Sequence, residues 1–201
     1  GLTKLPGNLS FLNGVKSINV AHNDLEELPE SIGSIHSLEK LDICNNAIKA
    51  LPNQLSRLVN LIELKAARNK LGKLQDTPGP LAALKNLLCC RQELHLSHEW
   101  IGSMTGLKKL DLSQNPHFLP ESIGDLTRLE YLNISLNELE KLPDSMGKLS
   151  NLTQLLAFNN NLETLPDSFC QLSNLTRLDL IDNRFEAIPG TISQLLKLAH
   201  L

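Results

Sequence analysis

The sequence predicts an α/β solenoid with a parallel sheet on its concave side and short turns on its convex side. First, a string of the form L-x-x-L-x-L-x-x-N-x-L-x-x-L-P recurs every 23 residues, except for one 22-residue step between Leu107 and Leu129. Second, the middle of each string alternates apolar and polar residues, as a short strand does. Third, a Leu-Pro step ends strand pairing and begins a return segment. A fixed period of this length marks a solenoid whose units contact their neighbours.

The best-preserved unit runs from Leu129 to Pro143. Leu132 and Ile134 are expected to point into the core, and Tyr131 to point outward from the sheet. Because such strands stack in parallel, we expect the outward residues of all units to line one common face. The other units start at Val15, Leu38, Leu61, Leu84, Leu107, Leu152 and Leu175, and a further unit begins at Leu198.

An asparagine follows each strand, where the chain must leave the sheet. Its side-chain amide can bond the backbone of the neighbouring turn and so satisfy buried groups that no strand reaches. We therefore predict a structural ladder, with one conservative departure, made of Asn23, Asn46, Asn69, Gln92, Asn115, Asn137, Asn160 and Asn183.

Residues 1–201 are expected to form one solenoid domain of about eight repeats. Leu2 to Pro6 has the pattern of a unit's tail without its strand, and Leu198 to Leu201 has the pattern of a unit's head. Solenoids need polar caps over their terminal apolar faces, and neither end of this sequence carries one. We therefore expect an excerpt of a longer array, with partial units at both ends.

The repeat is degenerate around residues 72–106. Leu74 lacks the usual following proline, and the run from Asp76 to Pro80 is turn chemistry. In the next complete unit, His117 stands where a leucine is expected.

Two registers compete for the strand of the fourth unit. One uses Leu84 to Cys89 with Gln92 in the ladder, and the other uses Gln92 to Leu96 as the strand itself. The first keeps three successive units 23 residues apart and places Ile101 and Met104 at core positions. We prefer this first register.

The overall composition argues against several classes of function. Apolar residues make up 41% of the chain and aromatic residues 3%, which predicts a core of leucine and isoleucine. A formal net charge of −3 gives no bulk reason for nucleic-acid binding, and no apolar run is long enough to span a membrane. No phosphate loop, nucleophile elbow or paired-carboxylate pocket is present. We expect no enzymatic activity, no cofactor and no small-molecule substrate.

The cysteines and the potential glycosylation sites point in opposite directions. Free, scattered thiols favour a reducing compartment, and they are Cys44, Cys89, Cys90 and Cys170. Four N-x-S/T triplets stand against that interpretation, at Asn8, Asn133, Asn151 and Asn174. We favour chance composition for these triplets, because a repeat rich in Asn, Leu, Ser and Thr generates them and a glycan on Asn133 would block the sheet face.

One stretch of the fourth unit carries metal-ligand residue types: Cys89, Cys90, His95, His98 and Glu99. Thiolate and imidazole are the ligands that zinc prefers, but the spacing fits no closed zinc motif. In the preferred register the side chains diverge, so no metal site is expected. Trp100 follows on the convex limb, either as a packing residue of the damaged unit or as an exposed contact.

Two kinds of side chain gather on the predicted sheet face. Units three to five carry basic residues opposed only by Glu63 and Asp111, namely Lys65, Arg68, Lys85, Arg91, Lys108 and Lys109. Units six to eight carry large apolar residues, namely Tyr131, Leu136, Leu156, Phe158 and Ile181. An exposed apolar patch usually marks a protein contact. The alternatives are that the lysines are simply solvated and that some apolar residues, Leu136 above all, turn inward at the strand end.

The repeat string resembles the leucine-rich repeat over the whole chain, which implies a horseshoe solenoid. The return segments Leu28-Pro29-Glu-Ser-Ile32 and Leu119-Pro120-Glu-Ser-Ile123 resemble those of the intracellular Ras-group repeats, including scribble-type scaffolds and Ras-suppressor-type proteins. That resemblance implies a cytoplasmic scaffold or signalling adaptor.

The sequence therefore leads to one main functional hypothesis and two alternatives. The main hypothesis is a non-enzymatic module that binds a protein or peptide on its concave face. The second is the recognition domain of a larger enzyme or immune receptor, such as a kinase or ubiquitin ligase. The third is an extracellular receptor ectodomain.

Overall fold

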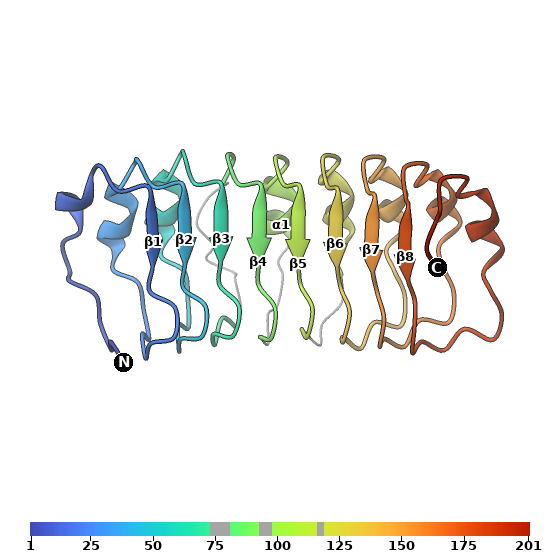
Figure 1. Cartoon of the computed structure of the whole chain (residues 1–201), viewed down its shortest axis with the longest axis horizontal. Coiled ribbons are helices and arrows are strands. Elements are labelled where there is room, and N and C mark those ends of the chain that lie inside the picture. Colours follow the sequence, from blue (N-terminus) through green and yellow to red (C-terminus); the bar gives the residue numbers. More distant parts are fainter. Residues whose placement is uncertain (73–80, 93–97, 116–118) are drawn as a thin grey trace.

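A computed structural model describes residues 1–72, 81–92, 98–115 and 119–201. Eight strands form one parallel sheet in chain order (Figure 1), which confirms the predicted α/β solenoid. Corresponding residues of adjacent strands pair directly, as Leu41 does with Leu64. The strands are β1 (Ser17–Asn19), β2 (Lys40–Asp42), β3 (Glu63–Lys65), β4 (Asn86–Leu88), β5 (Lys109–Asp111), β6 (Tyr131–Asn133), β7 (Gln154–Leu156) and β8 (Arg177–Asp179).

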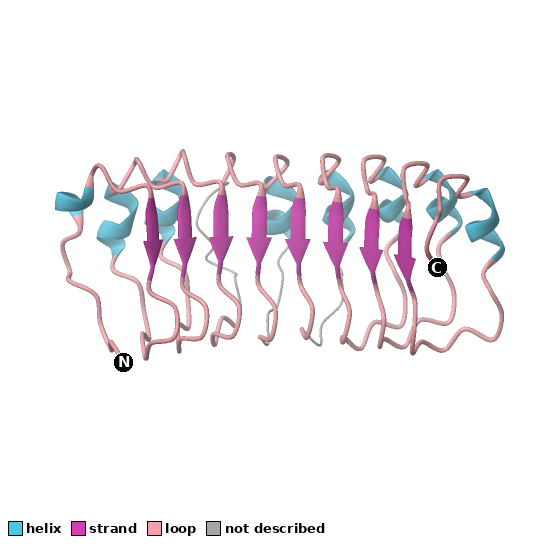
Figure 2. Ribbon diagram, in the orientation of Figure 1, coloured by secondary structure: helices cyan, strands magenta, loops and turns pink. Residues whose placement is uncertain are grey.

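Short helical turns lie behind the sheet, on the convex side (Figure 2). Most are 3₁₀ turns that begin just after the proline of the Leu-Pro step, and the N–H of the residue after each turn bonds back three residues, as Ile35 does to Ile32. Among the described residues they are η1 (Ser10–Leu12), η2 (Glu30–Ser34), η3 (Asn53–Arg57), α1 (His98–Ser103), η4 (Glu121–Asp125), η5 (Asp144–Lys148), η6 (Asp167–Gln171) and η7 (Gly190–Gln194).

The core lies between the sheet and the convex turns. The central residue of each strand points into it, as the alternation predicts, and from β2 to β8 this residue is a leucine that is at most 1% exposed. Each such leucine contributes about 1.5–3 kcal/mol relative to an exposed one. The turn residues Ile32, Ile123 and Phe169 close the core from the other side.

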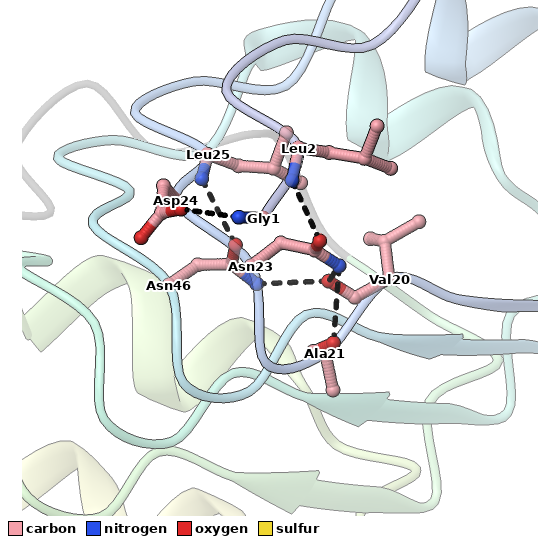
Figure 3. A network of polar contacts seen from close by, with 8 residues as sticks. All are labelled: Gly1, Leu2, Val20, Ala21, Asn23, Asp24, Leu25 and Asn46. Atoms are coloured by element: carbon pink, nitrogen blue, oxygen red, sulfur yellow. Dashed lines mark hydrogen bonds and ion pairs between the residues drawn. The ribbon is translucent and has the colours of Figure 1, made fainter.

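The asparagine ladder joins each coil to the one before it (Figure 3). Asn46 donates from Nδ2 to the carbonyl of Ile43 in its own coil and to that of Val20 in the preceding coil. Its Oδ1 accepts the N–H of Leu25, also in the preceding coil, at 3.0 Å. Asn69, Asn160 and Asn183 repeat these contacts. The ladder therefore satisfies backbone groups at the point where strand pairing stops.

The residue before each ladder position has a left-handed backbone with φ of 54–58°. This conformation turns the chain out of the sheet, and it is rare for residues other than glycine, asparagine and aspartate. The eight residues are His22, Asn45, Arg68, Arg91, Gln114, Leu136, Asn159 and Asp182.

The fourth unit adopts the first of the two predicted registers. β4 pairs Leu87 with Leu64 and with Leu110, and Gln92 occupies the ladder, donating from Nε2 to the carbonyl of Ala66. Ile101 and Met104 are fully buried, as that register requires.

The convex limb of this unit forms the short helix α1. Trp100 on it is 2% exposed and is therefore a packing residue. The turn chemistry at residues 76–80, Leu94 and His117 lie outside the described residues.

Candidate functional site

The concave face presents the first and third residues of each strand, together with the two residues that follow the inward residue after the strand. Because the strands are in register, these side chains form rows that cross the sheet. Adjacent members of a row are separated by about one strand spacing, roughly 4.8 Å. Residues 23 positions apart in the sequence are therefore neighbours on this face.

Of the six predicted basic residues, Lys65, Arg68, Arg91 and Lys109 occupy these face positions, whereas Lys85 and Lys108 come one residue before β4 and β5. The six differ in their partners. Lys108 pairs with Glu130, with 2.6 Å between Nζ and Oε1, and Lys65 lies 3.6 Å from Glu63. Arg68 donates a 3.5 Å hydrogen bond to the side chain of Asn45. In the described part of the chain, Lys85, Arg91 and Lys109 have no acidic partner.

The predicted apolar residues follow one another diagonally across β6 to β8. Tyr131 begins β6, Leu156 ends β7, and Phe158 follows Leu156 on the same face. All three are half-buried, whereas Ile181, in the row of Phe158 on the next coil, is 65% exposed. Partial burial raises the pKa of Tyr131, and the nearby Asp111 raises it further. We call Tyr131, Leu136, Leu156, Phe158 and Ile181 the apolar patch.

Leu136 does not turn into the core. Its side chain is 40% exposed, and its backbone has a φ of 57°. At the equivalent position the other seven coils carry polar residues. A bulky apolar residue in this conformation is an outlier, and such strain tends to occur at functional sites.

At the end of five strands, the side chain of the last strand residue accepts a hydrogen bond from the backbone that follows. There an Asp or Asn at the last strand position accepts the N–H two residues further on, at 2.9 Å from Asn19 to Ala21 and at 3.3 Å from Asp179 to Ile181. The other three are Asp42, Asp111 and Asn133. Coils three, four and seven have Lys65, Leu88 and Leu156 instead, so their backbone donors lack this acceptor.

Leu88 was missed by the sequence analysis. It is half-buried at the third position of β4, paired with Lys65 and Asp111. The preferred register already placed this residue on the outer face, so the signal was present. The single leucine was overlooked because it stands between charged neighbours.

The four cysteines are buried or half-buried. Cys89 is fully buried, and Cys90 lies half-buried on the opposite side of the chain. Burial raises the pKa of all three neighbouring thiols, Cys44, Cys89 and Cys90, with that of Cys44 reaching about 11. No group of three metal-ligand side chains occurs among the described residues. His95 and the side chains of His98 and Glu99 lie outside them.

Two of the sequon asparagines connect neighbouring coils through their side-chain amides. The Asn151 amide donates to the Thr127 carbonyl, and the Asn174 amide donates to the Ser150 carbonyl, both at 2.7 Å. Each bond ties a convex turn to the preceding coil. In the described part of the chain, no helix has the length and apolarity needed to cross a membrane.

The sequence profile described as "Leucine-rich repeat region" matches residues 84–201, more than half of the chain. The chain belongs to the leucine-rich repeat family. Members of this family are generally protein-interaction modules, and catalysis is not typical of them. No curated protein sequence matches the chain.

Several solved leucine-rich repeat structures are similar to this chain. A leucine-rich repeat protein of Leptospira interrogans superimposes with a TM-score of 0.88 at 28% identity, covering 100% of this chain and 59% of that protein. Internalin C2 of Listeria monocytogenes gives a TM-score of 0.82 at 24% identity, covering 94% of this chain and 81% of its own, and supports the fold alone. The plant peptide hormone receptor RGFR1, solved in complex with RGF2, gives 0.76 at 27% identity, covering 98% and 37%.

Proposed function

We propose that this leucine-rich repeat chain is a non-enzymatic scaffold or signalling adaptor that binds a protein or peptide partner on its concave face. The observation that carries the proposal is the apolar patch, whose members Leu136 and Ile181 are 40% and 65% exposed on a sheet face otherwise lined mainly by polar residues. A monomeric protein gains nothing from such exposure, whereas an interface does. The receptor RGFR1, solved with RGF2, supports a peptide as one class of partner.

The same proposal includes a cytoplasmic location and membership of the Ras-group subtype of repeat. Four free thiols, three with raised pKa values, support a reducing compartment. The structural contacts of Asn151 and Asn174 support the view that these triplets serve the repeat. The Leu-Pro-Glu-Ser-Ile return segments support the subtype.

The test combines Phe158→Asp with Tyr131→Ala. Partner capture from an extract of the native cells is expected to be lost, because a charge is placed in the apolar patch and an aromatic anchor is removed. The circular-dichroism spectrum and the unfolding midpoint are expected to remain close to those of the wild type. Phe11→Asp is the matched control, because Phe11 is 67% exposed on η1, away from the sheet face. Capture that survives the double substitution would reject the proposal.

A second candidate is the recognition part of a larger receptor or enzyme. The observation that favours it is the similarity to RGFR1, of which this chain spans only 37%. Sequencing the complete transcript separates the two candidates, because a kinase, ligase or membrane-spanning segment in the same reading frame would support the second.

A further inference from the structure

The proposed concave-face function leaves open what kind of ligand the face recognises. The open backbone donor, the apolar patch and the cations that lack an acidic partner among the described residues together indicate the class of ligand. We infer that the occupant is an extended polypeptide segment with a carboxylate side chain over β4 and β5 and a large apolar side chain over β7. This inference rests on the proposed function and specifies its partner.

The backbone N–H of Phe158 lacks the side-chain acceptor that five other coils have. In five coils the equivalent N–H donates a hydrogen bond to the side chain of an Asp or Asn two residues earlier, and that side chain lies on the concave face. In coil seven that position is Leu156, and the Phe158 N–H has no acceptor among the described residues. Because the acceptor reaches the N–H from the concave side in the other coils, a ligand carbonyl can do the same here. A ligand carbonyl at this position would give the N–H the partner that the chain itself does not supply.

Apolar side chains lie beside this N–H. Leu156 and Phe158 occupy two successive outward positions of one coil, and Ile181 follows in the row of Phe158. The open N–H is therefore flanked by apolar side chains that can hold a large apolar group. A main-chain donor beside an apolar anchor suits an extended peptide, which offers a carbonyl and a side chain together.

Basic side chains lie over β4 and β5. Arg91 and Lys109 have no acidic partner in the described part of the chain. Arg68 and Arg91 are the residues with left-handed backbone on two adjacent coils. The Arg68 N–H bonds to the Cys90 carbonyl at 2.9 Å, which fixes the two arginines on adjacent coils. Guanidinium groups bind carboxylates through paired, charge-assisted hydrogen bonds. Asp111 also lies on β5, where it accepts the N–H and the hydroxyl of Ser113, so the carboxylate subsite is the end of the coils near Arg68 and Arg91. Asp179 and Asp182 on the eighth coil disfavour a carboxylate at the other end of the face.

The spacing of the two subsites sets the register of the ligand. Strands β4 and β7 are three pairings apart, which corresponds to about 14 Å at roughly 4.8 Å per strand. An extended chain rises about 3.3 Å per residue, so about four residues span this distance. A segment crossing the sheet with an acidic residue about four positions from an aromatic or large aliphatic residue satisfies both subsites.

The test uses a phage-displayed library of random twelve-residue peptides, selected on the 201-residue chain. Enriched peptides are expected to share an Asp or Glu three to five positions from a Phe, Trp, Leu or Ile. Affinities of fluorescein-labelled synthetic versions are then measured by anisotropy. Arg91→Glu is expected to weaken binding at least tenfold, and replacing the peptide's acidic residue by Lys is expected to restore binding to that variant. Arg57→Glu on the convex turn η3 is the matched control and is expected to change nothing.

The possible outcomes distinguish a failure of the ligand assignment from a failure of the proposed concave-face function. Peptides that depend on Phe158 but carry no acidic residue, or that bind Arg91→Glu as tightly as wild type, overturn the inference and leave the proposed function standing. Peptides insensitive to both Phe158→Asp and Arg91→Glu overturn both. A library that yields no enriched sequence also overturns the inference, because an extended peptide would then not be the class of ligand.

Discussion

The backbone N–H of Leu136 donates a 2.9 Å hydrogen bond to the carbonyl of Phe158 on the next coil. This bond joins the two coils at the point where both apolar side chains emerge on the concave face. Residues 22 positions apart in the sequence are thereby brought together. The apolar patch is thus a property of the stacked coils, and no single repeat carries it.

Replacing Leu136 by asparagine separates binding from stability. Asn tolerates the left-handed backbone better than leucine does, so Leu136→Asn is expected to stabilise the fold by about 0.5–1 kcal/mol. The same change removes an exposed apolar contact and should weaken partner binding. Urea unfolding and a binding assay measure the two effects.

His22→Asn is the matched control for that substitution, because His22 has the same left-handed conformation with φ of 57° but lies on the first coil, away from the apolar patch. It is expected to leave binding unchanged. If Leu136→Asn bound the partner as well as the wild type, Leu136 would have no place in the binding surface.

Removing one ladder amide should destabilise the solenoid locally and strongly. Asn46→Ala leaves the Leu25 N–H without its acceptor, and it removes one of the two side-chain amide donors from each of the carbonyls of Val20 and Ile43. The expected cost is about 2–4 kcal/mol in the free energy of unfolding. Asn53→Ala, an exposed position on η3, should change this free energy by less than about 0.5 kcal/mol. Equal effects from the two substitutions would contradict a structural role for the ladder.

Replacing the glutamine of the ladder should raise the stability of the solenoid. Gln92 donates from Nε2 to the Ala66 carbonyl, but its buried Oε1 accepts no hydrogen bond from the described residues. Asparagine at this position should restore the acceptor geometry of the other rungs, so Gln92→Asn is expected to raise stability by about 1 kcal/mol. Thermal unfolding measures the gain. A loss of stability would show that the fourth unit has adapted to the longer side chain.

The spacing of the apolar residues was sufficient to predict the sheet, the ladder and the register of β4. Leu61, Leu84 and Leu107 are 23 residues apart, and a parallel stack then fixes which residues face the core. Side-chain pairing was less predictable. Lys108 was counted among the unopposed basic residues, yet it pairs with Glu130, which lies on the next coil across the one 22-residue step.

Such a pair depends on the rotamers of two long side chains, and the sequence pattern carries no information about rotamers. Leu156 shows the same limit in another way. Its place on the outer face could be predicted, but the open N–H of Phe158 could not. That feature appears only when the Asp and Asn acceptors of the other coils are seen in three dimensions.

Close packing of the convex turns leaves no room for a side chain at several glycines, including Gly124. A Cβ on Gly124 would lie 2.5 Å from the Ser145 Cβ and 2.7 Å from the Ser145 carbonyl oxygen on the next turn. Gly124→Ala is therefore expected to destabilise the fold by about 1–3 kcal/mol through overpacking. Gly14→Ala is the control, because nothing lies within 4 Å of its added Cβ. A neutral Gly124→Ala in urea unfolding would mean that η4 and η5 can separate without cost.

A carboxylate links the same two turns and should make their packing sensitive to pH. Glu121 accepts the Ser145 N–H at 3.0 Å through Oε2. Hydrogen bonding from Ser145, through its side chain and then its backbone, lowers the pKa of Glu121 below its usual value. The folded state therefore holds the proton less tightly than the unfolded state. The stabilisation is complete above the unfolded pKa, roughly 4.3, and is lost as the pH falls through the lower folded pKa.

The experiment compares Glu121→Gln with the wild type across this range. The wild type should have the higher unfolding midpoint at pH 7, and the difference should shrink towards zero as the pH falls below the folded pKa of Glu121. Taking the difference cancels the titration of the other carboxylates. Glu138→Gln, at an exposed position on the loop after β6, should show no such trend. A difference that stayed constant with pH would mean that the Glu121 carboxylate does not stabilise η5 through its charge.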